Sequence, residues 1–349
     1  MPTRIGPYEI LSELAKSPTG AVYKANDGDS GQMVALKAIQ LSAFGERAAE
    51  LQQALEKEVE NVKVLTSPNL TRVFNPAVIE GQFCAAMEYV QGNSIATMLA
   101  RNEGFSIWDL LDIGRQLCGG LDHASSHQIV HYSLEPSKIM CGWDGTVKIL
   151  SFGVSSLGNF VQLASEGVSS IMNYMSPEQV RGEATDARSN LFSLGAIFYE
   201  MVTEQKAFEG ADLESLRTSL LEGTPVPPVQ LNAKVHPLLS DLIMKVLAKD
   251  PGQRYQTGRQ LLDDLENCKE ARPAAKTAPV PRPASPVSNN VKATGQPKFA
   301  APKAKSQATP ASGASSTARR PAPPQSPSPL RPAVAKPGLA QPASRLATP

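Results

Sequence analysis

The composition changes abruptly near residue 272, and this confines any folded core to the part of the chain before it. Residues 273–349 contain 17 of the 29 prolines and 11 of the 34 Lys and Arg residues, but no Asp or Glu. A segment so poor in large apolar side chains cannot bury enough surface to offset the entropy lost on ordering. We therefore expect residues 273–349 to form a disordered, basic tail rich in Pro, Ala, Ser and Lys.

The charge is divided in the same way as the proline content. Residues 1–272 carry the other 23 Lys and Arg residues against all 33 Asp and Glu, a net charge of about −10. The near-neutral total therefore combines an acidic folded part with a basic tail. Because the tail has scattered cations and a single aromatic residue, Phe299, its composition argues against a nucleic-acid partner.

Several sequence features that are missing from the chain bear on where the protein is located in the cell. The four cysteines form no CxxC pair, so we expect neither a zinc site nor a disulfide framework, and a reducing compartment. The first ten residues, MPTRIGPYEI, have no long apolar run of the kind found in signal peptides. No stretch is apolar over the roughly 18 residues needed to span a membrane. We expect a cytoplasmic protein with no membrane segment.

Periodicity divides the acidic part in two. YEILSEL, AVYKAN and MVALKAI alternate apolar and polar residues, which predicts strands, with a turn at residues 17–20. Residues 47–65 show helical spacing, and a strand pair split at Glu80-Gly81 follows. After Gly92 the pattern is helical, and four segments predict helices: 107–126, 187–203, 236–249 and 257–270. A β-rich lobe followed by a helical lobe predicts an α+β fold.

Seven short segments carry a resemblance to a known family. In chain order they are VALK (34–37), Glu58 on the following helix, IVHYSLEPSKIM (129–140), VKILSFG (147–153), YMSPEQ (174–179), NLFSLG (190–195) and KDPGQRY (249–255). Together they are similar to the eukaryotic-like Ser/Thr protein kinases, and most like the bacterial branch. The resemblance covers about residues 5–272 and implies a two-lobed protein-kinase fold. Its N-lobe would span about residues 5–90 and its C-lobe about 91–272.

Four positions depart from the chemistry that the family uses. Its members hold Mg²⁺ with the Asp of DFG and the Asn of HRDxxxxN, and the Asp of HRD orients the attacking hydroxyl. In this chain these positions are Ser151, Lys138 and Ser133. A neutral hydroxyl is a poor ligand for Mg²⁺, and an ammonium has no acceptor lone pair. The family's Lys two residues after HRD is Glu135, whose negative charge would face a phosphate.

Other positions match the nucleotide site that the resemblance implies: Gly20, Val22, Ala35, Lys37, Glu58, Glu88, Val90 and Met140. In the family the Lys contacts the α- and β-phosphates and pairs with the helix Glu. Three apolar residues enclose the adenine, and the hinge backbone at residues 88–90 binds its edge. Of the phosphate-covering glycines only Gly20 is present, in Ala15-Lys16-Ser17-Pro18-Thr19-Gly20. Lys37 is retained either for nucleotide or only for an ion pair with Glu58, and Lys138 either replaces part of the metal charge or is a surface cation.

These departures lead to three hypotheses. The first is a pseudokinase, not an enzyme, that acts as a protein-binding or regulatory scaffold and binds ATP without transferring phosphate, independently of Mg²⁺ and with no firm metal site. The second is a residual Ser/Thr protein kinase with an unconventional metal site. The third is an interaction module that binds no nucleotide. We expect the first.

The expected partners are proteins, including an active kinase or another signalling protein. The tail segment PAPPQSPSPLRP (321–332) contains PxxP patterns, which suit the aromatic-lined grooves of Pro-recognition domains. The cations of the tail also suit an acidic surface.

In the C-lobe, Glu178 and Arg254 match a buried ion pair of the family.

Overall fold

The computed structural model describes residues 2–74, 76–157 and 170–270, which belong to one structural unit. The predicted tail, residues 273–349, lies outside these ranges.

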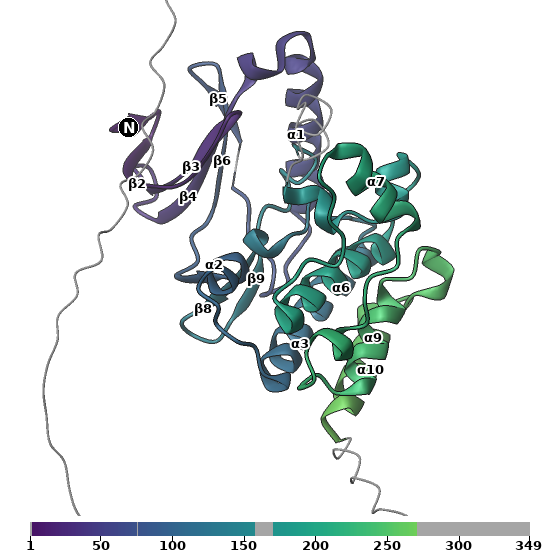
Figure 1. The fold of residues 1–349 in the computed structure, drawn as a ribbon. Coiled ribbons are helices and arrows are strands. Elements are labelled where there is room, and N and C mark those ends of the chain that lie inside the picture. The colour runs from purple at the N-terminus through teal and green to yellow at the C-terminus, as the bar shows by residue number, and fades with distance from the viewer. Residues whose placement is uncertain (1, 75, 158–169, 271–349) are drawn as a thin grey trace, which may run out of the picture. The chain divides into compact units, whose positions relative to one another are not determined.

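The N-terminal part is built on an antiparallel sheet with the strand order β1-β2-β3-β4-β6-β5 (Figure 1). Its strands are β1 (Arg4–Ile5), β2 (Tyr8–Ser17), β3 (Gly20–Asp27), β4 (Met33–Gln40), β5 (Ala77–Ile79) and β6 (Gln82–Glu88). Between β4 and β5 the chain forms a 3₁₀ helix, η1 (Leu41–Arg47), and the helix α1 (Ala48–Val62). Leu51, Leu55 and Val59 of α1 pack with Phe83 of β6 in one apolar cluster. This packing holds α1 against the sheet.

The C-terminal part is mostly helical. A small antiparallel sheet contains β7 (Gly92–Ser94), β8 (Ile139–Gly142) and β9 (Val147–Ile149). The α-helices are α2 (Ile95–Ala100), α3 (Ile107–Ser126), α5 (Pro177–Arg181), α6 (Ala187–Thr203), α7 (Leu213–Glu222), α8 (Pro228–Leu231), α9 (Pro237–Val246) and α10 (Gly258–Glu270). Three 3₁₀ helices complete it: η2 (Pro136–Lys138), η3 (Ser170–Tyr174) and η4 (Pro251–Gln253).

Helix α6 lies at the centre of this part, and nearly every residue from Ser189 to Thr203 is buried. A helix that is apolar on all sides is stable only when other elements surround it. Helices α3 and α9 pack against α6, and α10 packs against both α3 and α9. Gly114 of α3 allows the close contact with α10, because a β-carbon there would lie 2.7 Å from the side chain of Leu265.

Local signals set the ends of these helices. Ser106 and Asp109 form a reciprocal capping box at the start of α3, which satisfies backbone amides that the helix leaves unpaired. Asp122, in the body of α3, accepts the backbone N–H groups of Gly258 and Arg259 at 2.7 and 2.8 Å. A carboxylate at this position also complements the positive end of the α10 dipole. The acid therefore fixes α10 on α3.

The α+β prediction is confirmed, with a β-rich lobe followed by a helical lobe. The helices predicted at 107–126 and 187–203 have the observed bounds. The predicted helix at 47–65 is shorter, at 48–62. It follows directly on η1, inside which Gly45 has a non-helical backbone (φ 53°). Three residues at its end, 63–65, leave the helix.

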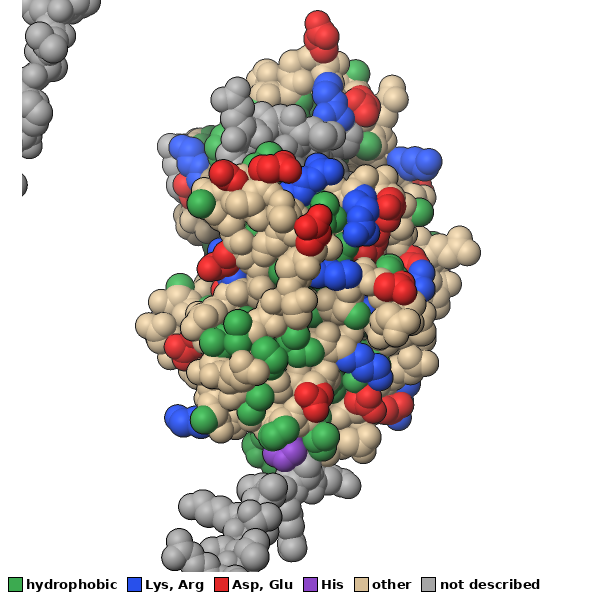
Figure 2. All heavy atoms as spheres, turned by 45° about the vertical axis from the view of Figure 1, so that its right-hand side comes forward, with side chains coloured by type: hydrophobic (Ala, Val, Ile, Leu, Met, Phe, Trp, Pro, Cys, Tyr) green, Lys and Arg blue, Asp and Glu red, His purple; other side chains and the backbone are tan. Residues whose placement is uncertain are grey.

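The described surface mixes charges of both signs. Figure 2 shows a face on which Lys and Arg side chains lie among Asp and Glu, while hydrophobic side chains gather on its lower half. The most exposed large hydrophobic side chains are Trp143 and Trp108. No helix in the described ranges is long and apolar enough to cross a membrane.

Candidate active site

Residues predicted to contact nucleotide come from both lobes. Val22 and Lys37 face each other across β3 and β4, and Ala35 pairs with Met87 across β4 and β6. Glu88 ends β6, and Met140 lies on β8 of the small sheet. The structure therefore brings Val22, Ala35 and Lys37 together on one sheet. The enclosure of adenine between these residues and Met140 stays a prediction.

Gly20 has a structural role besides the predicted one. It begins β3 and pairs with Ile39 of β4. A β-carbon at Gly20 would lie 2.1 Å from the carbonyl oxygen of Ala38, so only glycine permits this approach of the two strands. Its contact with phosphate stays a prediction.

Glu88 takes part in the contact between the lobes. Its carboxylate forms an ion pair with Lys148 of β9 at 2.9 Å, and its backbone N–H donates to the carbonyl of Arg72 at 3.0 Å. The hinge at residues 88–90 is thus linked to the small sheet below it.

Glu58 does not pair with Lys37 in this structure. Two consecutive serines that follow Gly153 hold its carboxylate instead. Ser155 donates its backbone N–H at 2.8 Å and its hydroxyl at 2.5 Å to one oxygen of Glu58. Ser156 donates its N–H at 3.0 Å and its hydroxyl at 2.5 Å to the other oxygen. We call these four hydrogen bonds the serine clamp.

The serine clamp was not predicted from the sequence. The signal that could have revealed it is the pair of hydroxyl residues at 155–156, one residue beyond the SFG segment. Hydrogen bonds from neutral donors to a charged acceptor contribute about 1.5–3 kcal/mol each. The clamp therefore competes strongly with Lys37 for Glu58.

The side-chain ammonium of Lys37 is consequently left without a hydrogen bond or ion pair among the described residues. Burial lowers its pKa to about 7, repulsion from Lys138 adds to this, and attraction by Glu58 and Glu135 opposes it. A cation in this state gains from any anion that reaches it. Lys37 is therefore prepared electrostatically to bind a phosphate.

Lys138 and Glu135 form a second charged pair nearby. Their ion pair is 3.3 Å long, and the Lys138 ammonium also donates to the hydroxyl of Ser137 at 3.2 Å. The Lys138 side chain keeps about a quarter of its accessible surface. It is therefore neither a free surface cation nor a fully buried one.

The three altered positions lie on two adjoining segments. Ser133 is buried, and its backbone N–H donates to Nδ1 of His131 at 3.3 Å. Nε2 of His131 donates to the carbonyl of Leu150 at 2.9 Å, which joins the two segments. Burial lowers the pKa of His131 to about 3, so its ring is neutral and bridges the segments as donor and acceptor.

Ser151 adopts a left-handed conformation, with φ of 68°. This region costs a serine about 1–2 kcal/mol, and Asp or Asn tolerate it better. The ring of Phe152 contacts the His131 ring edge-on at 4.8 Å between centroids. Packing of Phe152 therefore holds the strained backbone of Ser151 in place.

The donor set does not suit Mg²⁺. Ser133 and Ser151 offer neutral hydroxyls, and Lys138 offers a cation. Within the described ranges, no three His, Cys, Asp or Glu side chains lie close enough together to hold a metal ion. Mg²⁺ prefers carboxylate and phosphate oxygens. We therefore derive no catalytic step through a metal.

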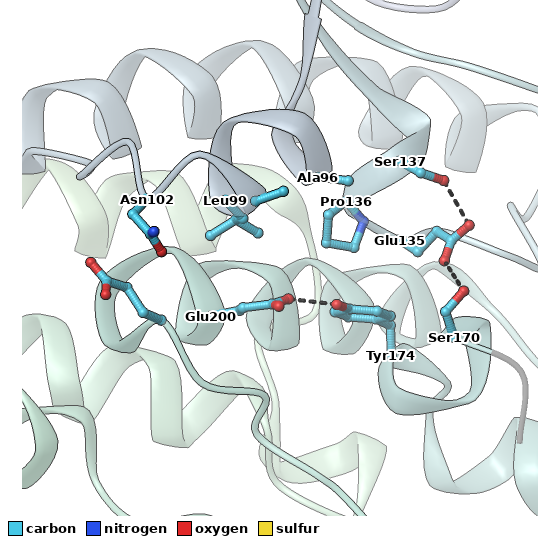
Figure 3. A pocket seen from close by; sticks show the side chains of 11 residues that line it. Ala96, Leu99, Asn102, Glu135, Pro136, Ser137, Ser170, Tyr174 and Glu200 are labelled. Atoms are coloured by element: carbon cyan, nitrogen blue, oxygen red, sulfur yellow. Dashed lines mark hydrogen bonds between the residues drawn. The ribbon is translucent and has the colours of Figure 1, made fainter. Parts of the chain in front are cut away.

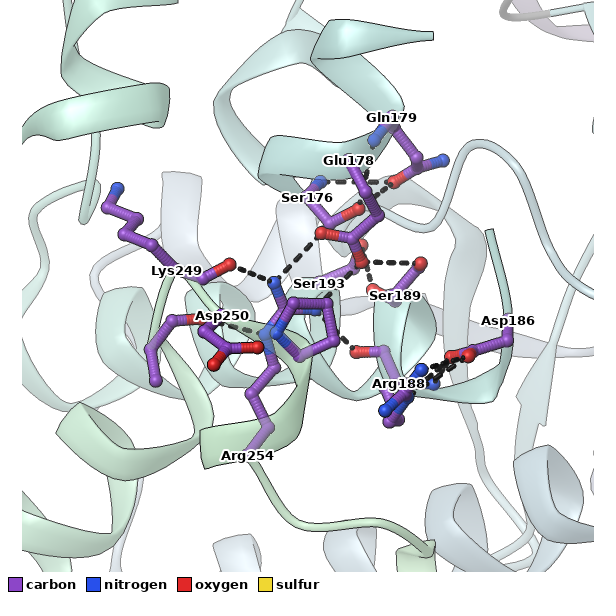
Figure 4. Close-up of polar contacts among 12 residues, drawn as sticks. Ser176, Glu178, Gln179, Asp186, Arg188, Ser189, Ser193, Lys249, Asp250 and Arg254 are labelled. Atoms are coloured by element: carbon purple, nitrogen blue, oxygen red, sulfur yellow. Dashed lines mark hydrogen bonds and ion pairs between the residues drawn. The ribbon is translucent and has the colours of Figure 1, made fainter. Parts of the chain in front are cut away.

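The helical lobe contains the ion pair expected between Glu178 and Arg254 (Figure 4). Two parallel N–H···O contacts of 2.8 Å join the side chains, and both residues are buried. Burial alone would raise the pKa of Glu178, but hydrogen bonds from Arg254 and Ser189 outweigh it and hold the pKa at about 2. The predicted ion pair is confirmed.

Asn190 stands where the family has an Asp, yet it still anchors the loop. Its amide oxygen accepts the backbone N–H of His131 at 3.0 Å, and its amide nitrogen donates to the carbonyl of His131 at 2.6 Å. A carboxylate could accept but could not donate. The amide therefore fixes the start of the loop with two bonds.

Comparison with known proteins agrees with the motifs. A family model described as the protein kinase domain matches residues 8–264. The chain is 30% identical over 264 residues to a probable serine/threonine-protein kinase of Clostridium perfringens, which covers 75% of this chain and 38% of that protein. It is 29% identical over 266 residues to serine/threonine-protein kinase PknB of Mycolicibacterium smegmatis, covering 74% of this chain and 42% of PknB. The chain thus spans about two fifths of the length of these relatives.

A solved structure agrees on the fold. The kinase domain of PknI from Mycobacterium tuberculosis superposes with a TM-score of 0.61 at 19% identity, covering 76% of this chain and 97% of that one. The predicted two-lobed protein-kinase fold is confirmed.

One expectation is contradicted. We expected that the chain is not an enzyme, but relatives that are 25–30% identical over most of the domain are named serine/threonine-protein kinases. They point to an enzyme. The expectation treated Ser133, Lys138 and Ser151 as decisive, whereas catalysis is shared with binding and positioning groups that survive the loss of individual side chains.

Proposed function

The chain belongs to the protein kinase family, and on this basis we propose that it is an ATP-dependent Ser/Thr protein kinase of low turnover. Lys37 and Lys138 hold the nucleotide phosphates, and their two ammonium groups supply charge that Mg²⁺ supplies in other kinases. The observation that carries this proposal is the unpaired Lys37, which lies within electrostatic range of Lys138.

This arrangement should lower the rate of phosphoryl transfer. Typical protein kinases turn over at about 1–100 s⁻¹, and a positioned acid–base group contributes about 10²–10⁴-fold. An ammonium neutralises phosphate charge, but it carries one positive charge where Mg²⁺ carries two, and it is not a Lewis acid. We expect phosphoryl transfer slower than about one turnover per minute, and ATP binding that does not require Mg²⁺.

The test combines binding and transfer on the full chain. Thermal unfolding is measured with ATP in the presence of Mg²⁺ and in the presence of a chelator, and transfer is followed with γ-labelled ATP and a mixture of Ser- and Thr-containing peptides. We expect similar stabilisation in both conditions, none for Lys37→Met, and a smaller shift in chelator for Lys138→Met. Slow labelling by the wild-type chain should disappear in Lys37→Met.

Two outcomes contradict the proposal. Stabilisation that appears only with Mg²⁺ would refute charge replacement by Lys138. An absence of both stabilisation and labelling would refute the enzyme.

A regulatory role is a second candidate, and the serine clamp favours it. Nucleotide that recruits Glu58 to Lys37 must remove it from Ser155 and Ser156, so ATP occupancy and the position of α1 are coupled. A protein partner that binds α1 in only one of its positions would bind in response to the nucleotide. Capture of such a partner from cells should depend on ATP and be lost in Lys37→Met, and comparison of the full chain with residues 1–272 tests whether the tail contributes.

A further inference from the structure

A groove lies beside the altered active-site loop. Figure 3 shows it between α2, the segment at residues 135–137, η3 and α6. Its volume is about 380 Å³, enough for a peptide side chain and part of its backbone. Three carboxylates line it, Glu135, Glu200 and Glu204, and no Lys or Arg does so.

Two of these carboxylates differ in what they bind. Glu200 accepts the hydroxyl of Tyr174 at 2.5 Å, a partner fixed in the buried core of the lobe. Glu135 is buried at the end of the groove, next to the active-site loop. One of its oxygens accepts the Ser137 hydroxyl at 2.7 Å and pairs with Lys138.

The other oxygen of Glu135 already binds a seryl hydroxyl. Ser170, the first residue of η3, donates to it at 3.2 Å (Figure 3). A carboxylate has about four acceptor positions, and the three donors among the described residues leave one open. The site therefore accepts the same chemical group that a Ser or Thr substrate presents.

The position of Glu135 relative to Lys37 and Lys138 also suits a substrate hydroxyl that lies close to a bound phosphate. It is two residues from Ser133, pairs with Lys138, and contributes to the electrostatics of Lys37. A phosphate held between the two ammonium groups would thus lie near the carboxylate. Because Lys138 neutralises Glu135, the repulsion between this carboxylate and a phosphate is reduced.

We propose that Glu135 is the catalytic residue that receives the hydroxyl of a Ser or Thr side chain bound in this groove, in place of the carboxylate missing at Ser133. This inference rests on the function proposed above. The substrate oxygen forms a bond to the γ-phosphorus of ATP while the bond from that phosphorus to the β–γ bridging oxygen breaks. The hydroxyl proton passes to Glu135, and ADP leaves with the bond's electron pair.

A purely structural role for Glu135 makes a different prediction. If it only anchors Lys138 and η3, its loss should weaken folding or ATP binding, and no new carboxylate elsewhere should restore the rate. A carboxylate placed at Ser133 cannot replace the ion pair geometry of Glu135, but it can orient a hydroxyl.

The test therefore uses Glu135→Gln, Ser133→Asp/Glu135→Gln, and the control Glu266→Gln, which changes an exposed carboxylate of α10 outside the groove. The full chain is assayed for peptide labelling, and ATP-induced stabilisation is measured for each variant. We expect Glu135→Gln to lower kcat about 10²-fold or more, with ATP stabilisation within about twofold of wild type in apparent Kd. The double variant should recover at least about tenfold, and Glu266→Gln should match wild type.

The outcomes distinguish a failure of the role proposed for Glu135 from a failure of the proposed function. Wild-type labelling with an unchanged rate in Glu135→Gln overturns the role of Glu135 and leaves the proposed function standing. A slow Glu135→Gln that Ser133→Asp does not rescue also overturns it, since the loss would then be structural. A wild-type chain that transfers no phosphate overturns the proposed function, and the role of Glu135 with it.

Discussion

Two ion pairs were expected from the sequence, and only one of them forms. Glu178 and Arg254 join in the helical lobe, whereas Lys37 and Glu58 stay apart in the active site. The Arg254 guanidinium also donates to the carbonyls of Ala248, Lys249 and Arg188, and stacks on the ring of Phe192. These partners hold the guanidinium in place opposite Glu178.

Glu58 is not restricted to Lys37 as its partner. Its competing donors belong to the segment after Gly153, and each serine offers both an amide and a hydroxyl. A buried pair stabilises a fold only where geometry and further hydrogen bonds satisfy both partners. The comparison teaches that matching residue types predicts which pairs can form, and the donors surrounding each partner decide which pairs do.

The largest effect should come from breaking the pair in the helical lobe. Arg254→Met leaves the buried Glu178 carboxylate without its charge partner, which typically costs about 3–5 kcal/mol. Urea unfolding of the full chain measures the loss. The exposed pair of Arg115 and Glu266, 3.2 Å long, is the control, since Arg115→Ala should cost less than about 1 kcal/mol. Equal losses of unfolding free energy in Arg254→Met and Arg115→Ala would contradict the expected difference between the buried and the exposed pair.

A smaller effect should come from opening the serine clamp. Ser156→Ala removes one hydroxyl donor from Glu58 and leaves the Ser155 hydroxyl and the two amides, which should destabilise the chain by about 1.5–3 kcal/mol. Because Glu58 is then easier to recruit, Lys37 should bind ATP more tightly. Urea unfolding and the ATP dependence of thermal unfolding measure the two effects. Weaker ATP binding in this variant would show that the clamp supports the nucleotide site.

The smallest effect concerns the pH dependence set by Lys37. Its pKa is about 7 in the folded chain and about 10.4 in an unfolded one. Between these values the unfolded chain binds more protons, so this group makes stability rise with pH, by less than about 1.4 kcal/mol per pH unit. Below pH 7 both states are protonated and the contribution is constant.

Lys37→Met should remove this slope. The stability of the wild type relative to the variant is compared between pH 7 and pH 9, in urea and without nucleotide. The difference should shift in favour of the wild type as pH rises. A difference that is constant with pH would mean that Lys37 is already paired in solution.

Much of the fold could be predicted because its signals are local. The helix at residues 107–126 has apolar residues at helical spacing and a capping box at its start, so its bounds matched. The helices of six residues or fewer, α2, α5 and α8, lack a long enough pattern to be recognised. The break at Gly45 depends on a single backbone angle that periodicity cannot reveal.

The sequence by itself determined the family, the two lobes, the buried Glu178–Arg254 pair and the loss of carboxylates at Ser133 and Ser151, because each is written in residue types at fixed spacing. Only the tertiary structure decided where Glu58 directs its charge and that Glu135 lines a groove and binds a seryl hydroxyl. Those outcomes depend on donors far apart in the chain, whose competition for one carboxylate is settled by distance and burial.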